Sequence, residues 1–245
     1  MKTAQFFFSS LALSLGLVAA AQAQSAAAEG RLYTPGPFDR LDVAGSAQVK
    51  LSQGERDQVF IAGDAEVQKG VEVDLANNRL TVRPTGGWKF WHSARLQIEV
   101  QMRNLSQLIL SGASDLHAPG AIKAEKLSVS ISGAGLARFD DLMVDQMRFD
   151  ISGAGDGILA GQVGELALNV SGKGKVQAEQ LRAARAVVSI SGIGNANLWV
   201  TDSLRVSISG IGSVEYWGQP ELRRSSSGLG SITGRGEKRG EAVKP

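Results

Sequence analysis

The sequence of 245 residues holds 26 lysines and arginines against 24 aspartates and glutamates, a formal net charge of +2. This near balance excludes the large basic excess that is typical of nucleic-acid-binding proteins, so we expect no nucleic-acid partner. The chain has no cysteine and only two histidines, which excludes disulfides, cysteine catalysis and multi-histidine metal centres. Thirty glycines and few aromatic residues indicate a backbone that turns often around small aliphatic side chains.

The first 23 residues have the three-part pattern of a secretory signal peptide. Lys2 precedes an apolar run from Phe6 to Ala20, and Ala21-Gln22-Ala23 fits the small-residue cleavage pattern. We therefore expect residues 1–23 to be removed on export to the periplasm, the cell surface or the medium, leaving a linker over residues 24–37. No later segment offers the roughly 20 consecutive apolar residues of a membrane-spanning helix.

Alternation of apolar and polar residues begins near Phe38, where we place the start of a β-solenoid domain over residues 38–234. Residues 54–104 interrupt it with short predicted strands at 58–62, 71–75, 79–83 and 95–102. Asn77-Asn78 lies between two of these strands and suits a tight hairpin turn. We interpret the block as an inserted antiparallel cap or side sheet, since an uncovered solenoid end is an exposed strand edge.

A Ser-Gly dipeptide recurs seven times between residues 111 and 228, with glycine-to-glycine spacings of 18 to 21 residues. From the second copy onward the motif is Ser-Gly-x-Gly. We predict that these glycines form the corners of coils, because glycine adopts positive φ freely and lets neighbouring backbones approach closely. The predicted corner glycines are Gly133, Gly135, Gly153, Gly155, Gly172, Gly174, Gly192, Gly194, Gly210, Gly212, Gly228 and Gly230.

Each motif follows a stretch with the pattern of a strand that has one buried face. Leu127, Val129 and Ile131 alternate with Ser128 and Ser130, for example. A unit of about 20 residues cannot bury this face alone, so the copies over residues 105–234 must stack as parallel coils about 4.8 Å apart. The predicted inward columns are Ile131, Ile151, Val170, Ile190 and Ile208, and Val129, Phe149, Leu168, Val188 and Val206.

The last segment, residues 235–245, is rich in charge and glycine. We expect it to be a disordered tail, because it has too little apolar surface to bury.

Two motifs carry a family resemblance. Leu110-Ser111-Gly112-Ala113, and the Ile-Ser-Gly-x-Gly copies that begin at Ile131, Ile151, Ile190 and Ile208, resemble the bacterial family named "putative autotransporter adhesin, head GIN domain", over about residues 38–234. The resemblance implies a single-stranded right-handed parallel β-helix, and the right hand agrees with the usual chirality of parallel crossovers. It also implies an exported protein with an adhesive role, and the family offers no catalytic motif. The predicted fold class is thus an all-β solenoid with an inserted antiparallel N-terminal cap.

The candidate ligand-binding segment is Trp88-Lys89-Phe90-Trp91, which gathers three aromatic rings directly after Gly86-Gly87. An exposed loop of this kind stacks on sugar rings or enters a membrane interface. The alternative is that the rings fold back over the cap or the first coil.

A second candidate group consists of acidic residues. Converging carboxylates bind calcium, but the repeat lacks the calcium-binding nonapeptide pattern, so we predict solvated carboxylates, no metal site and no cofactor. No nucleophile elbow, triad or concentration of acids is evident, so we predict no catalytic residues. The aspartates in this group are Asp140, Asp141, Asp145, Asp150 and Asp156.

These observations predict an exported, non-catalytic binding protein that presents a rigid solenoid surface to a glycan or cell-envelope component. Two alternatives stay open. A structural protein would form homo-oligomers through the last coil, near Gly228 to Gly234, and a β-helix enzyme would modify polysaccharides.

When the full chain is expressed in a bacterial host with an intact secretion pathway, we expect the exported protein to begin at Gln24. N-terminal sequencing and intact-mass measurement of the exported fraction check this. A protein that keeps Met1, or that is cleaved elsewhere, would contradict the predicted signal peptide.

Overall fold

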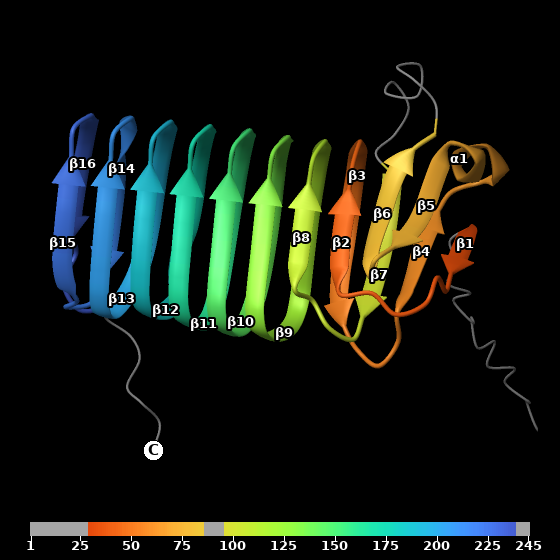
Figure 1. Cartoon of the computed structure of the whole chain (residues 1–245), viewed down its shortest axis with the longest axis horizontal. Helices are drawn as coiled ribbons and strands as arrows, with labels where there is room; N and C mark the ends of the chain where they lie inside the picture. Colours follow the sequence, from red (N-terminus) through yellow and green to blue (C-terminus); the bar gives the residue numbers. More distant parts are fainter. Residues whose placement is uncertain (1–28, 86–95, 239–245) are drawn as a thin grey trace, which may run out of the picture.

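The computed structural model describes residues 29–85 and 96–238. The chain forms an elongated β-solenoid of about six turns, with antiparallel strands at its N-terminal end. Figure 1 shows the coils side by side along the long axis. The all-β solenoid predicted from the sequence is therefore confirmed. Its repeat strands are β8 (Gln107–Leu110), β9 (Ala113–Ile131), β10 (Ala134–Ile151), β11 (Ala154–Val170), β12 (Lys173–Ile190), β13 (Ile193–Ile208), β14 (Ile211–Trp217), β15 (Glu221–Ser226) and β16 (Leu229–Gly234).

Each middle coil is one long bent strand that runs from one Ser-Gly motif to the next. Strands β9 to β13 are 16 to 19 residues long, so the return segment that the sequence left irregular is also paired. Their register is continuous over the six residues before each motif, and it shifts only near the return corner, for example between Ile158 and Ala160. The return corner thus absorbs the difference in repeat length.

Both predicted inward columns form the core. Parallel pairing places Ile131 beside Ile151, and Val129 beside Phe149, and the same register continues through the later coils. All ten side chains of the two columns are at most 1% exposed. The alternation in the sequence identified them correctly because the side-chain period of a strand is two.

The Ser-Gly corners depend on close main-chain contact between coils. A Cβ on Gly172 would collide with the carbonyl oxygen of Gly153, and the other motif glycines face similarly close neighbours. None of these motif glycines has a positive φ, so that part of the predicted reason was wrong. Ser152 and Gly153 donate their N–H groups to one carbonyl, that of Ile131, at 3.0 and 3.3 Å. Glycine is needed here for space.

The N-terminal block is more than a cap. Its elements are β1 (Gly30–Tyr33), β2 (Arg40–Val43), β3 (Ser46–Gln53), β4 (Gln58–Ala62), α1 (Ala65–Lys69), β5 (Val71–Ala76), β6 (Arg79–Pro84) and β7 (Leu96–Met102). The pairs β4–β7 and β5–β6 are antiparallel, as predicted. Strand β1 lies in the segment predicted to be a linker, residues 24–37, and pairs antiparallel with β4. However, β6 and β7 pair in parallel with β2 and β3, so they add a further coil outside the first one.

Two local features of this block follow from single residues. Asn77 and Asn78 have φ values of 51° and 59°, which confirms the tight turn between β5 and β6. Helix α1 was not predicted, because five residues are too short for a helical period. Asp64 caps it by accepting hydrogen bonds from the N–H groups of Glu66 and Val67 at 2.9 and 3.0 Å.

The last coil replaces core residues with polar ones. Arg224 and Ser226 lie in register with the buried Val206 and Ile208 of β13, and both are exposed. Repeat proteins need such polar terminal units to stay soluble.

The chain after β16 also differs from the prediction. The segment predicted to be a disordered tail starts at Arg235, but residues 235–238 contact the solenoid. The Arg235 N–H donates to the carbonyl of Tyr216 at 2.8 Å. Lys238 Nζ lies 4.4 Å from the centre of the Trp199 ring and donates to the Glu179 carbonyl at 2.6 Å. Residues 239–245 lie outside the described chain.

Gly172→Ala should lower the free energy of unfolding by about 1–3 kcal/mol or more, because the new methyl group has only main-chain atoms to displace. The matched control is Gly120→Ala in β9, where an added Cβ meets nothing within 4 Å. Urea unfolding of both variants checks this. Equal stability of the two variants would show that close packing does not explain the motif.

Candidate functional site

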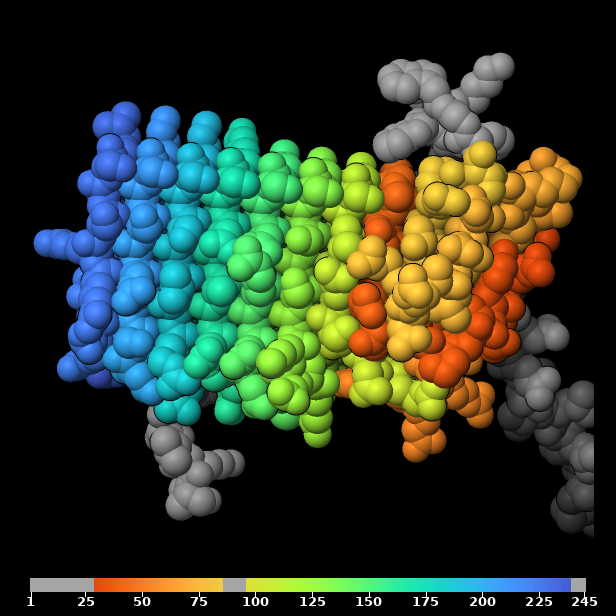
Figure 2. Space-filling view, in the orientation of Figure 1, coloured from red at the N-terminus to blue at the C-terminus, as the bar shows by residue number. Residues whose placement is uncertain are grey.

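A groove crosses the strands on one side of the solenoid. We call it the lateral groove, and its volume is about 740 Å³. Two rows of outward side chains line it, and Figure 2 shows the coils as adjacent bands, so each row runs along the solenoid. The first row is Lys126, Gln146, Glu165, Arg185, Ser203 and Glu221, and the second is Ser128, Arg148, Ala167, Val187, Arg205 and Arg223.

The rows follow directly from the strand pattern. Each member lies next to an inward residue on the strand that leads into a Ser-Gly motif, so it points outward. The parallel register sets Gln146 beside Glu165, Glu165 beside Arg185, and Arg185 beside Ser203. The buried Leu127, Met147, Leu166, Ala186 and Leu204 form the floor between the rows.

Arginine–carboxylate pairs bridge neighbouring positions of the groove. Arg185 donates to Glu165 of the preceding coil at 2.6 Å, and this hydrogen bond raises the pKa of the guanidinium. Arg223 pairs with Glu221 on its own strand at 2.9 Å. Arg148 donates to Asp150, just outside the lining, at 2.6 Å. These exposed pairs fix side-chain positions more than they stabilise the fold.

Two cations of the groove have no such partner. The side chains of Lys126 and Arg205 make no hydrogen bond or ion pair with any other residue of the described ranges. Arg205 is in register with the half-exposed Val187 on one side and with Arg223 on the other. With five cations and two carboxylates in its lining, the groove is positively charged although the whole chain is nearly neutral.

A second concavity lies where the N-terminal block meets the repeats. Its volume is about 680 Å³, and Lys50, Phe60, His117 and Arg138 line it. Asp140, beside it, lies 2.7 Å from His117 Nε2 and accepts a hydrogen bond from Arg138 at 2.7 Å. Its contact with His117 is the main cause that lowers the pKa of Asp140.

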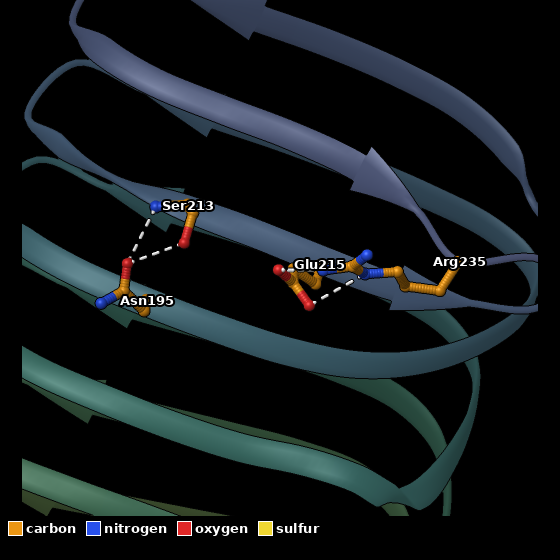
Figure 3. Close-up of polar contacts among 4 residues, drawn as sticks. All are labelled: Asn195, Ser213, Glu215 and Arg235. Carbon is orange, nitrogen blue, oxygen red and sulfur yellow. Dashed lines mark hydrogen bonds and ion pairs between the residues drawn. The ribbon is translucent and has the colours of Figure 1, made fainter.

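The outward column after the corners holds adjacent coils together. Asn195 Oδ1 accepts from both the N–H and the hydroxyl of Ser213, at 3.1 and 2.8 Å, as Figure 3 shows. Asp156 accepts likewise from the Lys175 N–H at 2.7 Å. In Figure 3, Arg235 also reaches back to Glu215, and this hydrogen bond lowers the pKa of the Glu215 carboxyl. These side chains hold neighbouring coils together. The lateral groove is therefore the better candidate for ligand binding.

The candidate segment of Trp88, Lys89, Phe90 and Trp91 lies outside the described residues. Its neighbours are Pro84, which ends β6, and Leu96, which begins β7.

The acidic group does not converge. Asp140, Asp150 and Asp156 each contact a different partner, as described above, and the described ranges contain no cluster of three or more histidines, aspartates or glutamates arranged to hold a metal ion. No helix within these ranges is long and apolar enough to cross a membrane.

The lateral groove was not predicted from the sequence. The signal was present, because the outward residues before each Ser-Gly motif can be aligned as readily as the inward ones. The corner where Trp199 is in register with Trp217 and is covered by Lys238 was not predicted from the sequence either. The alternation marks these positions as outward or inward, but only the register brings them together.

Comparison with known proteins identifies relatives of the fold. Residues 37–220 match the family described as putative auto-transporter adhesin, head GIN domain. A putative adhesin from Bacteroides fragilis has a TM-score of 0.81 at 23% identity, covering 84% of this chain and 95% of its own. A putative lipid binding protein from Parabacteroides distasonis has a TM-score of 0.69 at 20% identity, with 84% and 96% covered. No curated protein matches the sequence.

We expect the Asp140 carboxyl to titrate below its usual value of 3.8, and His117→Phe to move its pKa back upward. Because the folded pKa is depressed, the small stabilisation is present above the unfolded pKa and is lost as the pH falls through the folded pKa. Carbon-13 NMR titration of the carboxyl groups checks this. An unchanged Asp140 titration in the variant would contradict the role of His117.

Proposed function

The chain belongs to the putative auto-transporter adhesin, head GIN domain family, and from this premise we propose that it is an exported, non-catalytic binding protein that presents its solenoid surface to a glycan or another cell-envelope component. The observation that carries the proposal is the lateral groove, which extends across six coils with its side chains held in register. A fixed row of polar side chains suits a repetitive ligand, because many weak contacts on one rigid body add up.

Rigidity supports this role. Main-chain hydrogen bonds join neighbouring coils, and the aliphatic columns beneath the groove are at most a few per cent exposed. The outward side chains therefore stand on a surface that needs no ordering when a ligand binds, which reduces the entropic cost of association.

Assembly through the last coil is the alternative, and the charges there oppose it. Arg223 and Arg224 follow each other on β15, and Ser226 takes a position that is apolar in earlier coils. Charged residues on an edge strand disfavour pairing with another edge. Sedimentation analysis over a range of concentrations separates the two roles.

We expect the mature chain to bind polysaccharides on a glycan array and in pulldowns, without releasing new reducing ends. We also propose that the Trp88–Trp91 segment contributes, so Trp88→Ala/Trp91→Ala should weaken binding about tenfold through lost ring stacking. The control is Leu229→Ala, which trims an exposed apolar side chain in the last coil.

Binding that is retained in the tryptophan variant would contradict a role of the aromatic segment and would leave the solenoid surface as the binding site. Released sugar products would contradict the non-catalytic role. A failure to bind any polysaccharide or envelope fraction, together with self-association, would favour the assembly alternative.

A further inference from the structure

We propose that the lateral groove binds a linear polysaccharide that carries carboxylates, with Lys126 and Arg205 as its main anion contacts. The inference rests on the proposed binding function and names the class of ligand and the residues. Four features of the molecule support it: the unpaired cations, the composition of the lining, the direction of the groove and the charge of the whole chain.

Lys126 and Arg205 are the two cations of the groove whose side chains have no partner among the described residues. Arg205 and Arg223 lie directly opposite each other on adjacent strands, and like charges in this position destabilise a sheet. Glu221 pairs with Arg223, whereas Arg205 has no partner within the described residues. A carboxylate placed beside Arg205 would accept charge-assisted hydrogen bonds from its guanidinium and would remove the repulsion.

The composition of the groove lining favours one class of anionic ligand over others. Glu165 lies beside Arg185 and Glu221 beside Arg223, so a polymer with a negative charge on every unit would meet repulsion at both places. Val187 is 46% exposed, and the neighbouring Ala167 is also apolar. Ser128, Gln146 and Ser203 add hydroxyl and amide groups. A polysaccharide offers the matching mixture of carboxylates, hydroxyl groups and C–H faces.

The groove runs across the strands, along the stack of coils. Lys126 of β9 and Arg205 of β13 are four coils apart, which corresponds to about 19 Å at the usual strand spacing. An extended polymer along the groove would contact both of them and the ion-paired Arg185 between them. A small anion would reach only one. This geometry favours a linear chain of several sugar units.

The charge of the whole molecule argues against nucleic acid. The chain carries a formal net charge of only +2, and three acidic side chains, Glu165, Glu221 and Asp150, neutralise arginines in or beside the groove. Binding to nucleic acid depends on neutralising many successive phosphates. The positive charge of the groove is local and is interrupted by carboxylates, so it fits a polymer with spaced carboxylates better than it fits a nucleic acid.

The test compares hyaluronan, in which every second sugar carries a carboxylate, with its methyl-esterified form, which has the same backbone but few charges. Calorimetry should detect binding of the acidic form by the mature chain, and added salt should weaken it. Lys126→Gln/Arg205→Gln should weaken this binding at least about tenfold, as expected for lost hydrogen bonds to charged groups. Lys173→Gln/Arg224→Gln, which removes the same charges from exposed positions outside the lining, should leave it unchanged.

Other results would overturn the inference in distinguishable ways. Equal loss in both double variants would indicate nonspecific charge attraction. Equal binding of the esterified form, unaffected by the groove variant, would retain the glycan-binding function and reject the anion contacts. Competition by double-stranded DNA at equal charge would reject the polysaccharide class. Self-association through this face without glycan binding would reject both the inference and the proposed function.

Discussion

The close main-chain contact at the Ser-Gly corners sets the arrangement of the whole molecule. At each corner the serine and glycine N–H groups reach one carbonyl of the preceding coil, and the next residue pairs with the preceding glycine. A side chain at the glycine would push the two coils apart. Successive coils are thus fixed to each other at the same point, and differences in length are confined to the return corner, where the register shifts.

The position of the candidate site follows from this constraint. Register is unbroken on the strand that leads into each corner, from Gln146 to Ile151 and its equivalents. Both rows of the lateral groove lie on that segment. Outward residues near the return corner are offset from coil to coil and cannot form equally regular rows. We therefore expect a surface that binds a repetitive ligand to lie beside the Ser-Gly corner, where the register between coils is unbroken.

The exposed strand edges at the two ends of the solenoid are protected in different ways. At the N-terminal end the chain forms the first coil, β2 and β3, then adds the outer coil, β6 and β7, and returns to begin β8 on the opposite side. Antiparallel pairing of β4 and β1 continues the sheet at that end. At the C-terminal end, polar residues replace the core columns, and Lys238 crosses back to Trp199.

The sequence by itself determined the repeat, the strands and the inward columns, because side chains alternate with a period of two and glycine marks each close approach. It also indicated the hairpin at Asn77-Asn78 from the residues that tolerate positive φ. Only the tertiary structure decided that β6 and β7 stack outside the first coil, since spatial order need not follow chain order. It alone assembled the lateral groove, because Lys126 and Arg205 are far apart in sequence and acquire a common surface only through the coil-to-coil register.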